Sequence, residues 1–224
     1  MTRGTGRVAG VGEAHPAVDL PTGWRALARR FFDRPVAELA PALLYTLLVR
    51  REDDGSLTAA RLVEVEAYGG RDDPGSHARR GPTRANATMF AGPGHLYVYF
   101  TYGMHWCVNV TARAAPGEGA AVLLRAAAPV RGLDRMRARR PTARRDRDLC
   151  AGPARLAGAF GLTGAADGLD LCAGGPVFLA TDGTPAPARP GRSTRIGLAP
   201  HRCGGIRWRW YVPHDPYLSR PGGS

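Results

Sequence analysis

The chain has 224 residues and a formal net charge of +12, because 31 basic side chains outnumber 19 acidic ones. This length is enough to bury one sizeable core and does not require a second domain. The charge favours a polyanionic partner such as nucleic acid, although a basic surface can also serve solubility alone.

Every one of the basic residues is arginine, since the sequence contains no lysine. A Schiff base with a sugar could therefore form only at the terminal amine, which argues against lyase chemistry through a side chain. The four cysteines are widely separated and show no CxxC spacing, which argues against a structural zinc site. No apolar run reaches the length of a membrane span or a signal peptide, so we expect a cytoplasmic protein, associated with the nucleoid if the source is bacterial.

The chain is expected to form a single domain at residues 23–219, between a flexible N-terminal extension at 1–22 and a flexible tail at 220–224. The extension is rich in glycine and shows no hydrophobic period, so no regular structure is expected there.

Asp33 is expected to cap the first helix, in which apolar residues recur from Val36 to Leu44. Two alternating runs follow at 47–51 and 60–68, and the sequence Asp-Asp-Gly-Ser at 53–56 predicts the turn that joins them.

A second hairpin is expected from strands at 95–101 and 105–111, because Gly103 between them supplies the positive φ of a tight turn. The polar stretch before this hairpin is expected to be a surface loop with a short helical turn near His77.

The second half of the chain predicts a strand at 120–127 that ends at Pro129, helices at 131–139 and 152–160, an exposed loop at 183–195, and short strands at 194–197 and 207–212. Strands that come in hairpins, with helices between the groups, favour an α+β fold. We expect a curved, mainly antiparallel sheet with flanking helices.

Glu64, Glu66 and Tyr68 occupy alternate positions of one predicted strand, so their side chains share a face. One interpretation is an edge strand whose acidic face is solvated. Another is a pair of carboxylates in an inverting glycosidase, since residues two apart in a strand lie roughly 7 Å apart. A third is a site for a base extruded from DNA, because aromatic walls and a carboxylate that aims water would lie together.

Aromatic residues fill the second predicted hairpin. Ordinary sheet packing accounts for most of them, including Tyr97. Tyr102 and Met104 lie at the tip, where a side chain is poorly placed to join a core, and suit a wedge that enters DNA. The arginine-rich stretch at 135–148 is interpreted either as a contact for phosphates or as a solvated charged loop.

Six motifs resemble those of the alkyladenine (3-methyladenine) DNA glycosylase family, the type also found in animals: VEVEAY, DPGSHA, GHLYVYFTYGMHWCVNV, AVLLRA, LCAGPARL and WYVPHDPYLS. The match runs in order from about Phe31 to Leu218. The resemblance covers nearly the whole chain. It implies a single α+β domain with a projecting, DNA-intercalating β-hairpin and no metal or cofactor. It also implies duplex DNA containing damaged purines as the partner of a monomeric protein.

The resemblance implies that Glu66 is the general base that deprotonates the attacking water. Arg125 and the backbone carbonyl group of Val212 would help to hold that water. Tyr102, with Met104 beside it, would fill the hole that the extruded nucleotide leaves in the duplex.

The resemblance also implies a binding pocket for the flipped base. Tyr68 and His77 would stack on one face of the base and Tyr99 on the other. Asn109 would lie where the exocyclic amine of guanine would clash, which favours damaged adenine-type bases.

The chain departs from the family pattern at His105, where relatives carry tyrosine, and in an insertion at 114–118. Neither departure touches Glu66. We therefore expect a monofunctional glycosylase that removes alkylated purines, with deaminated or etheno purines as further candidates, and leaves an abasic site. The alternative is a non-catalytic lesion-binding module, which would have no need of a carboxylate at position 66.

Overall fold

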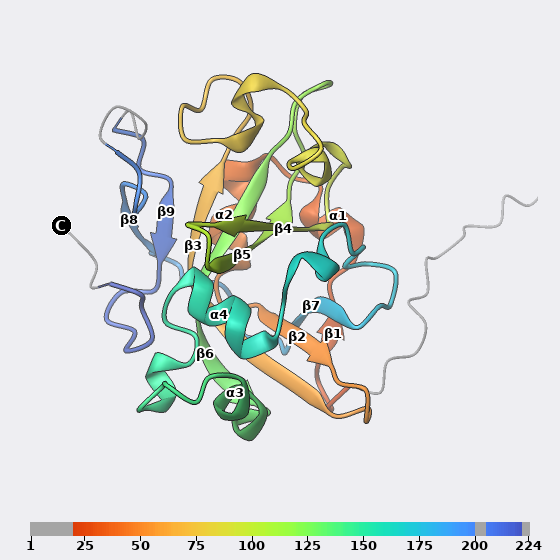
Figure 1. Ribbon diagram of the computed structural model, residues 1–224, viewed down its shortest axis with the longest axis vertical. Helices are drawn as coiled ribbons and strands as arrows, with labels where there is room; N and C mark the ends of the chain where they lie inside the picture. Colours follow the sequence, from red (N-terminus) through yellow and green to blue (C-terminus); the bar gives the residue numbers. More distant parts are fainter. Residues whose placement is uncertain (1–19, 200–204, 221–224) are drawn as a thin grey trace, which may run out of the picture.

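Nine strands form one sheet in the computed structural model, which describes residues 20–199 and 205–220 (Figure 1). Across the sheet lie β1 (Arg25–Ala26), β7 (Val177–Thr181), β2 (Leu47–Arg51), β3 (Leu57–Tyr68), β6 (Ala121–Arg131), β5 (His105–Thr111) and β4 (Leu96–Thr101), while β9 (Arg209–Tyr211) pairs with β3, and β8 (Gly191–Ser193) pairs with β9. All of these strand pairs are antiparallel, which confirms the predicted α+β class with a mainly antiparallel sheet.

In the described part of the chain, the sheet is accompanied by four α-helices and four short 3-10 turns: α1 (Arg29–Phe32), α2 (Val36–Leu43), α3 (Leu133–Arg139), α4 (Pro153–Phe160), η1 (His77–Arg80), η2 (Ala87–Phe90), η3 (Asp146–Asp148) and η4 (Gly164–Ala166). Helix α2 packs against β3 and β6, and α4 packs against β5 and β6 with α3 beside it (Figure 1). The helix pattern read from the sequence is confirmed in α2, whose buried residues recur at three- and four-residue intervals.

The main core lies between these helices and the sheet. Phe32 and Leu39 from α1 and α2, together with Phe160 from α4, are fully buried against residues of β3, β5 and β6. A smaller cluster, which includes Leu47 and Phe178, covers β2 and β7. These cores hold β3 rigidly at the centre of the molecule, which is the position from which the two carboxylates project.

Asp33 does not cap α2, contrary to the prediction. It lies at the C-terminal end of α1, and α2 begins after Pro35, whose ψ of 144° places it outside the helix. A proline disfavours helical geometry in the residue before it, so the helix cannot begin at position 34 and Asp33 is left upstream. The carboxylate instead lies 3.8 Å from the guanidinium group of Arg113.

The bounds of strands β2 and β5 match the prediction, whereas those of other elements differ. β3 begins at Leu57 rather than at 60, and β6 continues through Pro129 to Arg131. Proline is tolerated there because β5 pairs with β6 only up to Leu123, so this part of β6 has a strand neighbour on one side only. The exposed loop predicted at 183–195 is confirmed up to residue 190, whereas the short strand predicted at 194–197 lies instead at 191–193 as β8, which pairs with β9.

The predicted flexible ends are only partly described. Residues 1–19 and 221–224, which make up most of both, lie outside the described residues. Leu20 packs beside the small cluster on β2 and β7, and the carbonyl group of Arg220 accepts a hydrogen bond from Arg209.

The pairing of β3 with β6 is irregular at the carboxylates. Leu62 pairs with Ala127, but Glu64 pairs with Ala126 and Val65 with Leu124, so Arg125 is passed over in the register. Such irregularities bend strands and re-aim side chains. Here the irregularity sits where the Arg125 side chain meets both carboxylates of β3.

Candidate active site

Glu64 and Glu66 are buried in the centre of the sheet. Neither has any exposed surface, because β6 lies on one side of β3 at these positions and β9 lies on the other. The interpretation as a solvated edge strand is therefore wrong. An ionised carboxylate without partners in such a place would cost several kcal/mol, so the surrounding donors decide what each carboxylate can do.

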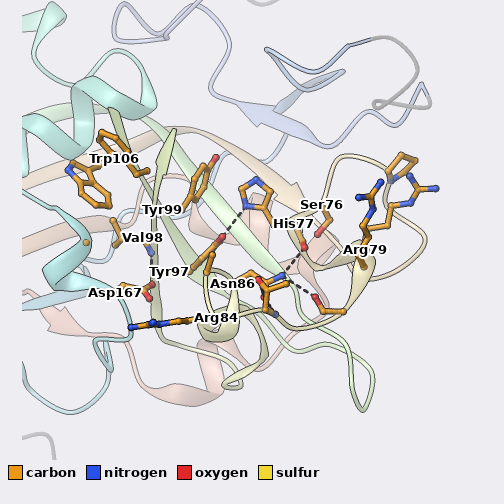
Figure 2. A pocket seen from close by; sticks show the side chains of 17 residues that line it. Ser76, His77, Arg79, Arg84, Asn86, Tyr97, Val98, Tyr99, Trp106 and Asp167 are labelled. Carbon is orange, nitrogen blue, oxygen red and sulfur yellow. Dashed lines mark hydrogen bonds between the residues drawn. The ribbon is translucent and has the colours of Figure 1, made fainter. Parts of the chain in front are cut away.

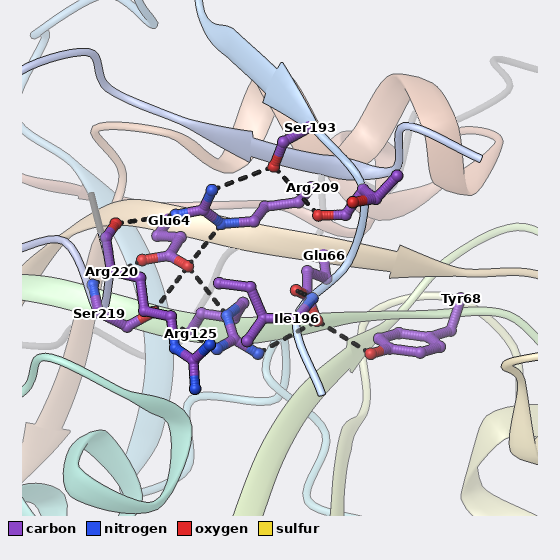
Figure 3. A network of polar contacts seen from close by, with 10 residues as sticks. Glu64, Glu66, Tyr68, Arg125, Ser193, Ile196, Arg209, Ser219 and Arg220 are labelled. Carbon is purple, nitrogen blue, oxygen red and sulfur yellow. Dashed lines mark hydrogen bonds and ion pairs between the residues drawn. The ribbon is translucent and has the colours of Figure 1, made fainter. Parts of the chain in front are cut away.

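Three donors surround the carboxylate of Glu66 (Figure 3). Oε2 accepts hydrogen bonds from the Tyr68 hydroxyl group at 2.9 Å and from Nη1 of Arg125 at 3.2 Å. Oε1 accepts one from the backbone amide of Ile196 at 2.6 Å. Arg125, which the resemblance implies helps to hold the attacking water, thus lies against Glu66.

Glu64 is held far more tightly. Its Oε1 atom accepts hydrogen bonds from Nε of Arg125 at 2.9 Å, Nε of Arg209 at 2.8 Å and the Ser219 hydroxyl group at 2.8 Å. Its Oε2 atom accepts one from the Ser219 amide at 2.7 Å. Because four donors, two of them from guanidinium groups, hold Glu64 in place, it is not available as the second carboxylate that an inverting glycosidase requires.

The two carboxylates therefore differ in acidity. Burial raises the pKa of Glu66, against the opposing effects of Arg125, the Ile196 amide and the Tyr68 hydroxyl group. Burial would also raise the pKa of Glu64, but the guanidinium groups of Arg125 and Arg209 hold it below its usual value. A raised pKa suits Glu66 to accept a proton, while Glu64 stays ionised and anchors the arginines.

Aromatic and small residues close a pocket next to Glu66. It is lined by Tyr68, Gly75, His77, Met89, Tyr97, Tyr99 and Asn109, so the four residues predicted to bind a base are brought together. Figure 2 shows His77, Tyr97 and Tyr99 gathered on this side of the sheet. The rings of Tyr97 and Tyr99 stack with their centroids 5.5 Å apart.

The space inside this pocket is about 20 Å³, room for about one water molecule. His77 and Tyr99 meet edge to face, with ring centroids 4.6 Å apart. A base stacked between two rings needs roughly 7 Å, twice the usual separation of packed carbon atoms. A purine can therefore enter only if these two rings move apart.

His77 is positioned by several hydrogen bonds. Its Nδ1 atom lies 2.9 Å from the Tyr97 hydroxyl group, and its carbonyl group accepts a hydrogen bond from the Asn86 side chain at 2.9 Å. Burial lowers the pKa of His77, which favours the neutral imidazole. Asn109 is held in the same pocket by a 3.0 Å hydrogen bond to the Tyr97 carbonyl group.

Tyr102 and Met104 are the most exposed large apolar residues in the described part of the chain, at 79% and 68%. They flank Gly103, whose φ of 65° confirms the predicted positive-φ turn. Tyr102 itself has a φ of 51°, and a side chain in this region costs about 1 kcal/mol. The tip thus presents an aromatic ring that no packing contact explains.

Val212 comes directly after Tyr211, the residue of β9 that pairs with Glu64. It follows β9, and its amide donates to the carbonyl group of Val63, three residues before Glu66. Its own carbonyl group accepts a hydrogen bond of 3.4 Å from the Asp215 amide. Among the described residues no other backbone amide donates to this carbonyl group, so one of its lone pairs is left for a water.

The arginine-rich stretch at 135–148 is largely neutralised by carboxylates. Arg137 pairs with Asp134 and Asp146, and Arg145 pairs with Asp148. Arg135 pairs with Asp54, and Arg139 pairs with Glu52. Ion pairing leaves these four side chains less available for phosphates than the sequence suggests.

A different group of arginines lies beside the base pocket. Arg79, Arg80 and Arg84, on and after η1, line a groove of about 740 Å³ (Figure 2). Within residues 20–199 and 205–220 these three make no ion pair with a carboxylate. Phe100 and Trp106, whose ring centroids are 4.8 Å apart, also line this groove. The groove shares His77, Tyr97 and Tyr99 with the pocket, so the two are continuous.

Three parts of this site were missed from the sequence. Ile196 acts through its backbone amide, and a backbone amide carries no signal in the residue type. Arg195 and Asp73 form a buried ion pair behind Tyr68, and these two residues lie more than a hundred positions apart.

Within the described part of the chain, no group of three or more His, Cys, Asp or Glu side chains is arranged to hold a metal ion. No helix among the described residues is long and apolar enough to cross a membrane.

Comparison with known proteins gives a consistent result. The model of the methylpurine-DNA glycosylase family matches residues 30–216. A protein of Burkholderia lata is 51% identical over 197 residues, covering 87% of this chain and 91% of the relative. Relatives from Streptomyces avermitilis, 48% identical over 86% of this chain and 90% of the relative, and Methanocella arvoryzae, 41% identical over 87% and 96%, share with it the name "putative 3-methyladenine DNA glycosylase".

Proposed function

The chain belongs to the methylpurine-DNA glycosylase family and is a DNA glycosylase of base excision repair, and from that premise we propose that it extrudes alkylated purines from duplex DNA and hydrolyses their N-glycosidic bonds with water activated by Glu66. The observation that carries this proposal is the buried Glu66, which has a raised pKa and lies beside an aromatic pocket. We expect the protein to act as a monomer, in the cytoplasm or on the nucleoid.

In the chemical step, the oxygen of a water attacks C1′ of the sugar while its proton passes to the Glu66 carboxylate. The bond between C1′ and the base nitrogen breaks, and its electron pair leaves with the base. Arg125 holds Glu66 from the side of β6, because it donates to both carboxylates of β3. The ionised carboxylate also stabilises the positive charge that develops on the sugar. We propose that the free lone pair of the Val212 carbonyl group helps to hold the same water.

The base would bind between aromatic rings, with Tyr68 and His77 on one face and Tyr99 on the other. His77 and Tyr99 must separate for this, so the free-energy cost of opening the pocket offsets part of the favourable free energy of stacking. Stacking contributes roughly 1 to 3 kcal/mol per base, and extrusion costs a few kcal/mol, least for damaged pairs. The closed pocket therefore adds to the preference for bases that leave the duplex easily.

The pocket favours leaving groups that are already cationic. Burial lowers the pKa of His77, so this side chain is poorly suited to protonate a neutral base on departure. A purine alkylated on a ring nitrogen needs no such proton, because it leaves as a neutral molecule. Asn109, held in place by the Tyr97 carbonyl group, would exclude the exocyclic amine of guanine.

Tyr102 and Met104 would fill the gap in the duplex, since both are exposed at the tip of the hairpin formed by β4 and β5. The groove lined by Arg79, Arg80 and Arg84 would hold the phosphates of the strand that carries the lesion, because these arginines have no carboxylate partner among the described residues.

The test is single-turnover release of 3-methyladenine, and separately of hypoxanthine, from labelled duplex DNA. Wild type should release 3-methyladenine, whereas Glu66→Gln should be slower by about 100-fold or more and still bind the lesion. Glu38→Gln, a change at an exposed position on α2, is the matched control and should behave as wild type. Equal release by wild type and Glu66→Gln would remove Glu66 as the base. Tight, salt-dependent binding without release by wild type would favour the lesion-binding module.

A further inference from the structure

An ion pair is buried directly behind the base pocket. Nη1 and Nη2 of Arg195 each lie 2.6 Å from an oxygen of Asp73, a bidentate arrangement. The side chains are 0% and 2% exposed. Asp73 is fixed in turn, because its oxygens accept the amides of Gly69 and Gly75 at 2.9 Å.

Besides Arg125, two groups donate hydrogen bonds to Glu66: the Tyr68 hydroxyl group and the Ile196 amide. Arg195 contacts the segment that carries each of them. Its guanidinium carbon lies 4.7 Å from the centroid of the Tyr68 ring, and the Tyr68 hydroxyl group donates to Oε2 of Glu66. The next residue in the chain, Ile196, donates its amide to Oε1 of Glu66 at 2.6 Å. Nη1 of Arg195 also donates to the carbonyl group of Ala67, between Glu66 and Tyr68.

We propose that Arg195, clamped by Asp73, is a positioning residue that sets the orientation of the Glu66 carboxylate through the Tyr68 ring and the Ile196 amide. This inference rests on the proposed role of Glu66 as the base. Arg195 does not touch Glu66 itself. It holds the Tyr68 ring on one side of the Glu66 carboxylate and the Ile196 backbone on the other. Oε2 of Glu66 then meets the Tyr68 hydroxyl group, and Oε1 meets the Ile196 amide.

Burial of this ion pair costs free energy of desolvation, so stability alone is a poor explanation for its presence. A buried ion pair often contributes little net stability, since the desolvation of both charges offsets their attraction. Moreover, Nε of Arg195 is buried without a hydrogen-bond partner among the described residues. What the pair does achieve is to connect the loop that carries Asp73 to the segment that carries Ile196, across the back of Tyr68.

Arg195 also adds a positive charge near Glu66. The titratable and charged groups around Glu66 include Glu64 and Tyr68 on β3, Tyr99 on β4, Cys107 on β5, Arg125 on β6, Arg195 before β9, and Arg209, which pairs with Glu66 in the register of β3 and β9. Among these groups the arginines favour the ionised carboxylate by their charge. Weakening Arg195 therefore makes Glu66 harder to ionise, and the activity should be lost at higher pH than in wild type.

The experiment compares Arg195→Lys and Asp73→Asn with wild type in single-turnover excision of 3-methyladenine across pH. Lysine keeps the charge but lacks the bidentate fork, and asparagine removes the charge that holds the fork. We expect the rate at pH 7 to fall roughly 10-fold in both variants. In Arg195→Lys the acid limb of the profile should also move to higher pH, because the donors to Glu66 are held less firmly. Affinity for the lesion duplex should change far less than the rate.

Glu52→Gln is the matched control. It breaks another ion pair, in which the partly buried Arg139 lies 2.6 Å from the buried Glu52, among residues that do not line the pocket. All variants are assayed below the melting temperature of the least stable one, and Asp73→Asn decides the question if Arg195→Lys does not fold. If neither variant folds, the Tyr68→Phe variant is assayed with intact Arg195, and an acid limb that does not move would overturn the inference. So would rates and acid limbs in the Asp73 and Arg195 variants that match Glu52→Gln.

A double variant tests whether Arg195 acts on Glu66 through Tyr68 or only through a general loss of order in the site. In a Tyr68→Phe background, Arg195→Lys should shift the acid limb by less than it does alone, because one of its two connections to Glu66 is already gone. The Glu66→Gln variant distinguishes a failure of the positioning role from a failure of the proposed function. If Glu66→Gln is inactive but Arg195→Lys keeps the wild-type profile, only the positioning role is wrong; if Glu66→Gln is active, the proposed function itself is wrong.

Discussion

The hydroxyl group of Tyr68 donates a hydrogen bond of 2.9 Å to Oε2 of Glu66, two residues earlier on β3. Burial raises the pKa of Tyr68 well above its usual value, so the hydroxyl group keeps its proton and remains a donor. A wall of the base pocket and the proposed general base are thus parts of one hydrogen-bonded unit, and a change in the wall should alter the acidity of the base.

Tyr68→Phe should move the acid limb of excision to higher pH. Glu66 must be ionised to accept a proton, and the lost donor favours the ionised form, so its removal raises the pKa of Glu66 further above 4.5. A hydrogen bond to a charged group contributes about 1.5 kcal/mol, which corresponds to a shift of about one pH unit. The measurement is the pH profile of single-turnover release. Tyr45→Phe, away from the pocket, should leave the profile unchanged; an unmoved limb in Tyr68→Phe would count against the coupling.

Glu64→Gln should lower the free energy of unfolding by about 3 kcal/mol at pH 7, because two buried arginines lose the charge that they share. Urea unfolding measures this, with the exposed Glu38→Gln as control.

The effect should depend on pH. The arginines hold the pKa of Glu64 below its usual 4.5, against the effect of burial. Its contribution to stability is therefore complete above pH 4.5 and is lost as the pH falls through the lower pKa of the folded state. Wild type and variant should converge in acid, and a constant difference would show that Glu64 contributes by packing rather than by charge.

Tyr102→Ala should slow excision from duplex DNA more than from a single strand that carries the same lesion. The wedge is needed only where extrusion leaves a gap in stacked pairs, and a single strand has no such gap. Rates on the two substrates are compared under single-turnover conditions, with Val130→Ala as a control at an exposed apolar position on β6. Equal losses on both substrates would assign Tyr102 to the pocket or to folding.

The double variant Arg79→Ala with Arg84→Ala should bind DNA less tightly and with a weaker dependence on salt. Each lost phosphate contact lowers the log-log slope of affinity against salt by about 0.9. The matched control is Arg137→Ala with Arg145→Ala, which removes the same charge from side chains already paired with Asp146 and Asp148. Titrations at several salt concentrations measure both slopes. A larger change in the control would assign the phosphate contacts to residues 135–148 instead.

Local patterns were sufficient for much of the fold. The bounds of β2 and β5, the turn at Gly103 and the helical turn at His77 follow from residues close in the sequence, because alternation and turn chemistry act over a few positions. The cap at Asp33 failed for an equally local reason, the proline two positions later.

The motifs also identified Glu66 and the tyrosines as candidate site residues, but they could not assign different roles to Glu64 and Glu66. The sequence shows two similar carboxylates on one strand, and only the tertiary structure surrounds one with two arginines and a serine from distant segments. In the same way, partners such as Glu52 and Asp54 neutralise arginines more than eighty positions away. Burial and charge pairing depend on contacts between segments far apart in the chain, so the sequence by itself determined which chemical groups are present, and the fold decided which of them are buried, paired or left to react.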